Sequence, residues 1–487
     1  MSNFLKLTPI AVIAGLMLSG VDILIAAPVA FAYAVIVGML VARFKFSELL
    51  DAALTNLQNF LIVFLILQLA YAVAECFMAT GVAASVINLA LSAGLTARGV
   101  ATVGFLCTCA LSIATGTSWG TFAACAPIFL WLNHIVGGDI LLTIGAIAGG
   151  ACFGDNIGLI SDTTVVSSGI QGVEVIKRVR HQGVWSLLCL IAAAVMFYVA
   201  GSSVAGSGVA VKASEAIAQI PESVWTKLAE ERESAVILLK QVKGGVPYMM
   251  IVPFIVVLGT AFAGVNTLIC LTSGILSSLV FGWAFGTVTS LSDFAGYCFT
   301  GFSDAGGWSI AMMLWIGAFG GVMYKMQAFD PIATLILRVS RKVRHLMTCN
   351  ALLCLLGNAA LSDEMAQITT IGPIIKDLTE KNVEGSPEDM YTLALRNATY
   401  ADAMAVLGSQ LIPWHAYMAF FIGISRSVYP LAEKTIDPFG IIAHNYLAWI
   451  AVISIVVLTY TGFDRFIPLF RIPGEPQVRL KKHAETA

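Results

Sequence analysis

The sequence predicts an all-α polytopic membrane protein made of two inverted-topology repeats with discontinuous or re-entrant helices. Of its 487 residues, 58% are hydrophobic and only 11% are charged, and the mean hydropathy is +0.87. Soluble domains average about 45–50% apolar and about 25% charged residues. Two further observations support this fold class: a series of long apolar runs, and the recurrence of sequence blocks at nearly one spacing.

The apolar runs are long enough to cross a bilayer, which takes roughly 17–25 residues in a helix. They fall near residues 8–25, 27–42, 58–80, 99–115, 121–136, 140–157, 183–201, 247–263, 265–286, 308–327, 346–361, 364–378, 392–412 and 443–461. We expect about 12–14 spans, because the runs around 110–128 and 356–375 could instead form re-entrant hairpins.

The internal repeat is clearest in two polar blocks. Residues 116–122 align with residues 362–368, about 246 positions later. Residues 153–162 align with residues 400–409, at a spacing of about 247 positions. Repeats of this size inside a membrane protein are typical of secondary transporters, whose binding site lies where the two copies meet.

The distribution of Lys and Arg predicts that the second copy is inverted. Basic residues gather in cytoplasmic loops. Residues 43–45 include two basic residues, whereas the aligned loop 287–306 has none. Loop 91–99 has one basic residue, whereas its partner, 338–344, has four. The basic loops therefore lie on opposite sides of the two copies, as an inverted repeat requires. We expect both termini in the cytoplasm.

Four regions follow from this topology. The first transmembrane repeat is expected at 1–182, followed by a linker helix and external loop at 183–246. The second, inverted repeat is expected at 247–442, before a terminal helix and a basic cytoplasmic tail at 443–487. Within the linker, the charge-balanced stretch 202–246 could fold as a helical cap or remain a mobile loop.

Polar residues interrupt the apolar runs in four blocks, which are the candidate binding site. A charged group at the bilayer centre costs about 2.5–3.5 kcal/mol on insertion scales, so such groups are expected to be functional. In the first block, glycines weaken a helix whose freed carbonyls and hydroxyls could bind a cation. Its candidates are Thr115, Gly116, Thr117, Ser118 and Thr121. A small-residue helix packing face is the alternative.

The second block combines two carboxylates, an amide and hydroxyls. Asp155 and Asp162 are seven positions apart, which in a helix places them on one face. Hard oxygen donors of this kind suit Na⁺ or H⁺ better than a transition metal. The candidates are Asp155, Asn156, Ser161, Asp162, Thr163 and Thr164. For Asp162, a solvated helix cap is the alternative.

The third and fourth blocks lie in the second copy. The candidates of the third are Asn358, Ser362, Asp363 and Glu364, although the two acids could instead form a helix cap. The candidates of the fourth are Thr399, Asp402, Ser409 and His415. Asp402 aligns with Asp155, and His415 could exchange protons or simply be packed. Arg396 is expected at a helix end, or as a partner of Asp402.

Four motifs resemble the NhaC family of sodium/proton antiporters, which lies within a larger superfamily of inverted-repeat secondary carriers. They are Gly116-Thr-Ser-Trp-Gly-Thr121, Phe153-Gly-Asp-Asn156, Ser161-Asp-Thr-Thr164 and Leu411-Ile-Pro-Trp414. The resemblance covers nearly the whole chain and implies a multi-pass antiporter of a bacterial cytoplasmic (inner) membrane. It also implies that the second block is the family's polar cluster. Some relatives exchange malate and protons for lactate and sodium, and others move amino acids or dicarboxylates.

The chain departs from the family pattern within that cluster and again in the second copy. Gly158-Leu159 stands where the family usually has Ser-Pro, and Ile160 replaces the following Leu. In the second copy, Tyr400-Ala401-Asp402 and Ser409-Gln410 replace two adjacent acids and another Ser-Pro. Losing a helix-breaking Pro and gaining a Gly would reshape the pocket.

The leading hypothesis is alternating-access exchange of Na⁺ for H⁺, in which one or both of Asp155 and Asp402 bind Na⁺ when charged and H⁺ when neutral. The alternative is a Na⁺- or H⁺-coupled transporter of a small organic acid or amino acid, whose carboxylate would bind helix N-termini near Gly116 and Ser362. Neither hypothesis describes an enzyme, and no cofactor is expected besides the coupling ions. The expected partners are a small ion or organic solute and the lipid bilayer, without nucleic acid; a homodimer is compatible with this fold.

Overall fold

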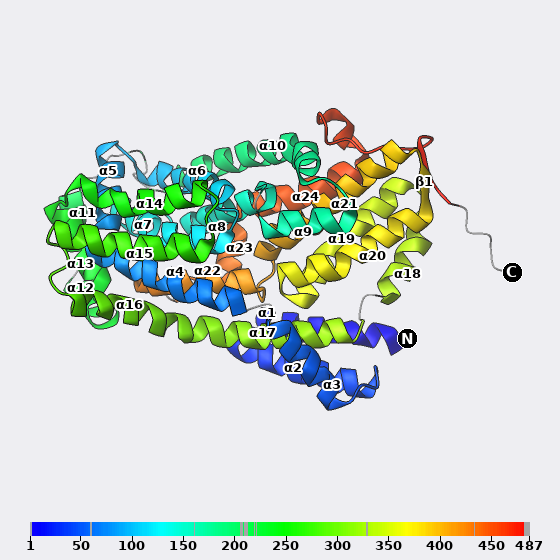
Figure 1. Ribbon diagram of the computed structural model, residues 1–487, viewed down its shortest axis with the longest axis horizontal. Helices are drawn as coiled ribbons and strands as arrows, with labels where there is room; N and C mark the ends of the chain where they lie inside the picture. The colour runs from blue at the N-terminus through cyan, green and yellow to red at the C-terminus, as the bar shows by residue number, and fades with distance from the viewer. Residues whose placement is uncertain are drawn as a thin grey trace.

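The computed structural model is a bundle of helices that extends along one axis (Figure 1). It describes residues 2–58, 61–159, 161–204, 208, 213–218, 220, 222–327, 330–432 and 434–481. Both termini lie toward one end of the long axis. The helices α11 (Ala213–Ala218), α12 (Glu222–Glu231) and α13 (Glu233–Gly244) lie at the other end. The described part of the stretch 202–246 is therefore largely a helical cap.

The described residues of the first half form one short 3-10 helix and ten α-helices. They are η1 (Ser2–Leu7), α1 (Thr8–Leu18), α2 (Ile23–Leu40), α3 (Phe46–Gln58), α4 (Leu61–Thr80), α5 (Val82–Ser92), α6 (Ala97–Thr115), α7 (Ser118–Val136), α8 (Ile140–Ile157), α9 (Asp162–Gln171) and α10 (Val175–Gly201).

The second half follows the cap. It comprises η2 (Tyr248–Ile251), α14 (Val252–Phe262), α15 (Thr267–Ala284), α16 (Leu291–Gly306), α17 (Trp308–Lys325), α18 (Asp330–Val339), α19 (Val343–Leu361), α20 (Glu364–Asn382), α21 (Pro387–Val406), η3 (Gly408–Leu411), α22 (Ala416–Val428), η4 (Pro430–Ala432), α23 (Pro438–His444), α24 (Tyr446–Thr461) and η5 (Phe463–Phe466). The strands β1 (Val383–Gly385) and β2 (Val478–Leu480) pair antiparallel and fasten the chain's end to α20 and α21.

Several helices of the two halves agree in order and length. Helices α1 and α14 each have 11 residues, and α2 and α15 each have 18. Helices α6, α7, α19 and α20 each have 19. The starts of α2 and α15 are capped alike, because Asp22 and Asn266 each accept a hydrogen bond from the backbone N–H two residues later, at 2.8 and 2.9 Å. This agreement supports repetition, while the inversion and the region boundaries stay predictions.

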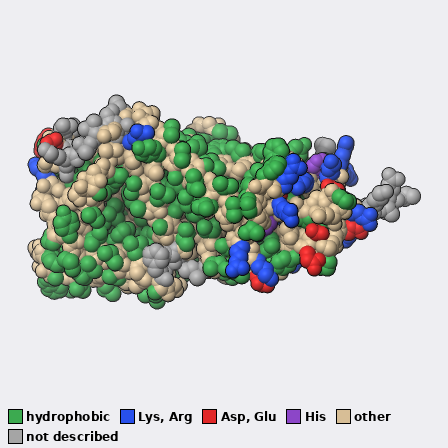
Figure 2. All heavy atoms as spheres, turned by 90° about the horizontal axis from the view of Figure 1, so that it is seen from above, with side chains coloured by type: hydrophobic (Ala, Val, Ile, Leu, Met, Phe, Trp, Pro, Cys, Tyr) green, Lys and Arg blue, Asp and Glu red, His purple; other side chains and the backbone are tan. Residues whose placement is uncertain are grey.

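The described helices include many that are suited to a membrane. Six are long and apolar enough to cross one, and up to eight spans result if each of two pairs bent by 65° counts as one. Shorter apolar helices, among them Ala97–Ile113 and Ala416–Val428, pack beside these. Figure 2 shows hydrophobic side chains over most of the visible face and charged ones gathered toward the end that carries the C-terminus. The fold is thus an all-α polytopic one, and the number of spans stays a prediction.

Arg232, at the start of α13, fastens the cap to the bundle. Its buried guanidinium pairs with Glu75 of α4 and, at 2.6 Å, with Asp304 of α16. It also donates a hydrogen bond to the hydroxyl of Ser427 at 2.9 Å. Glu75 therefore has a structural partner inside the apolar bundle, as a buried carboxylate requires.

Helices α6 and α8 approach closely because α8 carries small residues along one side. A Cβ at Gly150 would overlap the hydroxyl of Thr108 and lie 2.5 Å from the carbonyl oxygen of Phe105. Gly154, one turn later, meets the backbone of α6 at Ser112 and Ile113 even more tightly. Small residues four apart let membrane helices pack backbone to backbone. This contact places the end of α8, which carries Asp155, beside the end of α6.

We expect Gly150→Ala to destabilise the protein by about 1–3 kcal/mol, because the added methyl forces the two backbones apart. Melting of the purified protein in detergent measures the effect. Gly183→Ala in α10 is the matched control, since a Cβ there has no neighbour within 4 Å. Equal melting temperatures for the two variants would contradict the close α6–α8 contact.

Candidate functional site

Two helix breaks have the same backbone geometry. Gly116 ends α6 with φ +64°, and Ser362 ends α19 with φ +59°, so both adopt the left-handed conformation. The next residues, Thr117 and Asp363, are extended, with φ −145° and −146°, and they precede α7 and α20. The left-handed region is rare for residues with a side chain. The carbonyl of Ser362 accepts a hydrogen bond from the Ala416 N–H at 3.2 Å, which helps to hold this conformation.

Both breaks line a single cavity of about 380 Å³. It brings together predicted site residues from three of the four sequence blocks: Gly116, Thr117, Asp155, Asp162, Thr163, Asp363 and Glu364. The rest of its wall consists of Ile62, Ile66, Trp119, Gly264, Val265, Asn266, Thr267, Met365 and Tyr417. Four of these lining residues are acidic, and among the described lining residues none is Lys, Arg or His. The wall of the cavity is therefore acidic.

Asp155 is the carboxylate most fully enclosed by donors. It is 4% exposed and accepts hydrogen bonds from the Ser118 N–H at 3.2 Å, the Ser118 hydroxyl at 2.5 Å and the Ser161 hydroxyl at 2.5 Å. The hydroxyl of Tyr417 donates a further bond at 3.1 Å. Because Ser118 is the first residue of α7, the positive end of that helix also faces the carboxylate. These donors stabilise the charged form and surround it with hydroxyl oxygens.

Asp363 and Glu364 begin α20 and face the same cavity. Asp363 caps the helix, since its Oδ1 accepts a hydrogen bond from the Ala366 N–H at 2.6 Å. The capping alternative and the site prediction for this residue are therefore compatible. Glu364 is 7% exposed, and its Oε2 has no hydrogen-bond partner among the described residues. Asp162, in the first turn of α9, is exposed toward the cavity.

Asp402 lies outside the cavity, in an ion pair that its alignment with Asp155 did not predict. Its Oδ2 pairs with the guanidinium of Arg178 in α10, and both side chains are fully buried. The same oxygen accepts from Asn156 at 3.0 Å and from Thr164 at 3.3 Å, and Arg178 also donates to Thr164 at 2.9 Å. Asp402 does not line the cavity and already has a cationic partner, whereas Asp155 lines it. Cation binding at Asp402 stays a prediction.

Sequence reasoning missed Arg178 because it belongs to a basic run that is typical of a cytoplasmic loop. A signal was present: Arg178 is spaced by four and seven residues from Gln182 and Trp185, which share its buried helix face. Arg396, which was expected at a helix end or beside Asp402, is instead fully buried. It contacts Asp464, at 3.5 Å, and the carbonyl of Phe470.

Several predicted residues serve the scaffold. Asn358 donates hydrogen bonds to the carbonyls of Met404 and Ala405 and accepts one from His415 Nε2 at 2.9 Å. His415 Nδ1 accepts from the Tyr417 N–H, so the ring is neutral and fixed in one tautomer, which argues against a proton-exchanging role. Three further predicted residues donate a hydrogen bond from their hydroxyl to a backbone carbonyl of their own segment: Thr121, Thr399 and Ser409. The side chain of Thr115 lies outside the described part of the chain.

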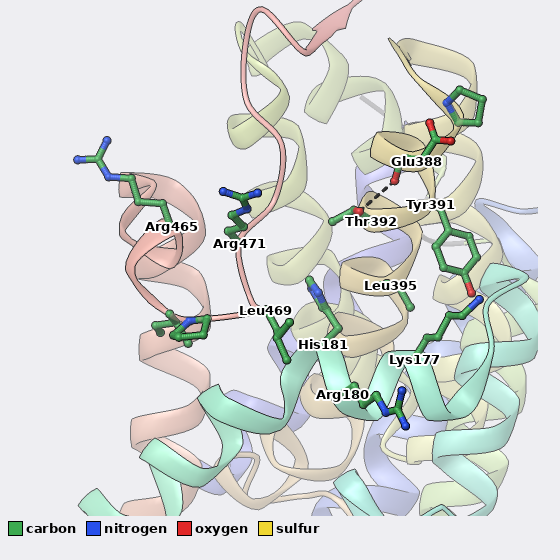
Figure 3. Close-up of a pocket in the computed structure, with 13 residues that line it drawn as sticks. Lys177, Arg180, His181, Glu388, Tyr391, Thr392, Leu395, Arg465, Leu469 and Arg471 are labelled. Atoms are coloured by element: carbon green, nitrogen blue, oxygen red, sulfur yellow. Dashed lines mark hydrogen bonds between the residues drawn. The ribbon is translucent and has the colours of Figure 1, made fainter.

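A larger cavity, of about 1010 Å³, lies away from these residues (Figure 3). It is formed by the start of α10, the start of α21 and the segment 465–471. Its wall carries Lys177, Arg180, Arg465 and Arg471, but Figure 3 shows the side chains of Arg180 and Arg465 pointing in different directions. It contains no predicted site residue. We therefore take the smaller acidic cavity as the candidate site.

Removing one partner of the buried Arg178–Asp402 pair should leave an uncompensated charge and cost about 3–5 kcal/mol. We expect Arg178→Met to melt well below the wild type in detergent, and Arg178→Met combined with Asp402→Leu to regain much of the loss. Arg180→Met is the control, because Arg180 is exposed. If Arg178→Met melted together with Arg180→Met, the ion pair would not be the contact that we describe.

Comparison with known proteins agrees with this architecture. The model of the Na⁺/H⁺ antiporter family matches residues 4–202 and 150–463. The chain is 24% identical over 335 residues to the Na⁺/H⁺ antiporter NhaC of Bacillus subtilis (strain 168), covering 64% of this chain and 68% of that protein. Over 99 residues it is 34% identical to the malate-2H⁺/Na⁺-lactate antiporter of the same organism, covering 20% of this chain and 21% of that protein.

A third relative is the arginine/ornithine antiporter ArcD of Halobacterium salinarum. It is 21% identical over 396 residues, which cover 77% of this chain and 73% of that protein. The family match spans most of the chain, and it confirms the resemblance found in the motifs. The chain belongs to the Na⁺/H⁺ antiporter family and is a multi-pass secondary antiporter.

Proposed function

We propose that the chain exchanges Na⁺ for H⁺ across a bacterial cytoplasmic membrane, and that the two ions compete for Asp155. One observation carries this proposal. Asp155 lines the cavity and, at the same time, is bonded to the hydroxyls of Ser118, Ser161 and Tyr417. Carboxylate and hydroxyl oxygens are the hard ligands that suit a cation such as Na⁺.

The competition follows from the chemistry of these groups. A hydroxyl keeps acceptor lone pairs and can rotate, so the groups that now donate to Asp155 could turn their oxygens toward a cation. Protonation of the carboxyl removes its charge and thereby its attraction for Na⁺. Each ion then leaves when the other binds, which is what coupled exchange requires. Two broken helices around one central site are typical of carriers that work by alternating access.

Asp402 has a positioning role in this proposal. Its pair with Arg178 connects α21 to α10, and Asn156 and Thr164 connect the pair to α8 and α9. Asn156, the residue after Asp155, is therefore hydrogen-bonded to Asp402 in the second half of the chain. This connection supports the orientation of the Asp155 carboxylate without placing a second ion at Asp402.

A second candidate function is the coupled transport of a small organic solute. Two relatives are named for organic cargo, one for malate and lactate and the other for arginine and ornithine. The cavity supports this candidate by its size, because about 380 Å³ is far more than a water molecule's share of liquid volume, about 30 Å³.

Asp155→Asn should reduce the rate of Na⁺-driven proton movement at least about ten-fold, because the amide cannot exchange a proton at neutral pH. The measurement is the response of a pH dye inside proteoliposomes when Na⁺ is added. Asp377→Asn is the matched control, because Asp377 is an exposed carboxylate paired with Lys381. Full activity of Asp155→Asn would exclude Asp155 as the exchange site.

The Na⁺ concentration that gives half-maximal flux should rise as the pH falls. Protons then occupy more of the Asp155 carboxyl, and for strict competition the rise approaches about ten-fold per pH unit on the acidic side. Flux in proteoliposomes, measured over a Na⁺ series at several pH values, tests this. A half-maximal concentration that is independent of pH would mean that the ions bind different groups.

A further inference from the structure

The cavity has features that a lone Na⁺ does not require. We infer that it also binds an organic cation as cargo, namely a primary ammonium or guanidinium group on a short apolar stem. This inference rests on the proposed function, because it concerns the same cavity of the same antiporter.

The charges of the cavity favour a cation over an organic anion. Helix N-termini are where a substrate carboxylate would be expected to bind. Here, however, the start of α7 faces Asp155, and the start of α20 is capped by Asp363. The protein's own carboxylates thus occupy both positions. With Asp162 and Glu364 also in the wall, an anion would meet four acidic side chains.

Among the described residues that line the cavity, Glu364 has a buried carboxylate oxygen without a hydrogen-bond partner. This oxygen is Oε2, and the residue is 7% exposed. A buried carboxylate oxygen without a donor is costly inside an apolar bundle. An ammonium or guanidinium group in the cavity would supply N–H donors as well as charge. Asp155, in contrast, already has four hydrogen bonds, so the two carboxylates are not equivalent.

The remaining wall suits the rest of such a molecule. The rings of Trp119 and Tyr417 lie with their centroids 4.6 Å apart, and both line the cavity. The two rings pack on each other, and a cation at the cavity side of either ring would be attracted to it. Apolar wall for an aliphatic stem is provided by Ile62, Ile66, Val265 and Met365. The cavity therefore combines an acidic part with an aromatic and aliphatic part.

The test uses agmatine and putrescine as organic cations and malate as the anion, each at equal ionic strength in a buffer without Na⁺. Melting of the purified full chain in detergent reports binding, and exchange of labelled agmatine in proteoliposomes reports transport. The variants are Glu364→Gln and Asp162→Asn; because Asp162 is exposed, its substitution should not impair folding. The matched control is Glu388→Gln, an exposed carboxylate outside the cavity.

We expect agmatine or putrescine, but not malate, to raise the melting temperature and to be exchanged. The dissociation constant should rise about ten-fold in Glu364→Gln and Asp162→Asn, as expected for the loss of one charge-assisted hydrogen bond, and should stay unchanged in Glu388→Gln. Stabilisation by malate, binding without exchange, or equal weakening in Glu388→Gln would each overturn the inference.

The two proposals can fail separately. If Na⁺ drives proton flux but neither organic cation binds, the inference is wrong and the proposed Na⁺/H⁺ exchange stands. If an organic cation is bound and exchanged while Na⁺ moves no protons, the inference stands and the Na⁺/H⁺ proposal is wrong.

Discussion

The hydrogen bonds around the carboxylate of Asp155 join four segments, one of which, α22, lies far from the others in the sequence. The carboxylate belongs to α8, and its donors come from the start of α7, from the residue before α9 and from α22. A carboxylate inside an apolar bundle must be surrounded by donors or lose its charge. Because these donors exist only when the segments are in place, the position of the site and the packing of the bundle depend on each other.

The two helix breaks show how one backbone solution can carry different chemistry. Gly116 and Ser362 share nearly the same dihedral angles, and so do the residues that follow them. The first break is followed by hydroxyl groups and the second by Asp363 and Glu364. The backbones of the two breaks are thus alike, whereas the second makes the cavity acidic. This difference in side chains is the basis on which we infer an organic cation as cargo.

Charged residues inside the bundle fall into two groups. Arg178, Arg232 and Arg396 are each paired with a carboxylate and connect helices or the cap to the bundle. The acids of the cavity face no basic lining residue among those described. Removing one partner of such a buried ion pair leaves the other charge uncompensated and destabilises the fold. In our proposals the carboxylates of the cavity bind a mobile cation instead.

Much of this protein can be read from the sequence alone. Its apolar runs and low charge determine the all-α membrane fold, and the aligned blocks locate both helix breaks, because a repeated backbone needs similar local signals. The same blocks also contain Asp155, Asp363 and Glu364. Only the tertiary structure separates Asp155, which faces the cavity, from Asp402, which pairs with Arg178. The physical reason is that ion pairs and cavities form between distant helices, so the spacing of residues along one helix cannot show which carboxylate finds a cationic partner.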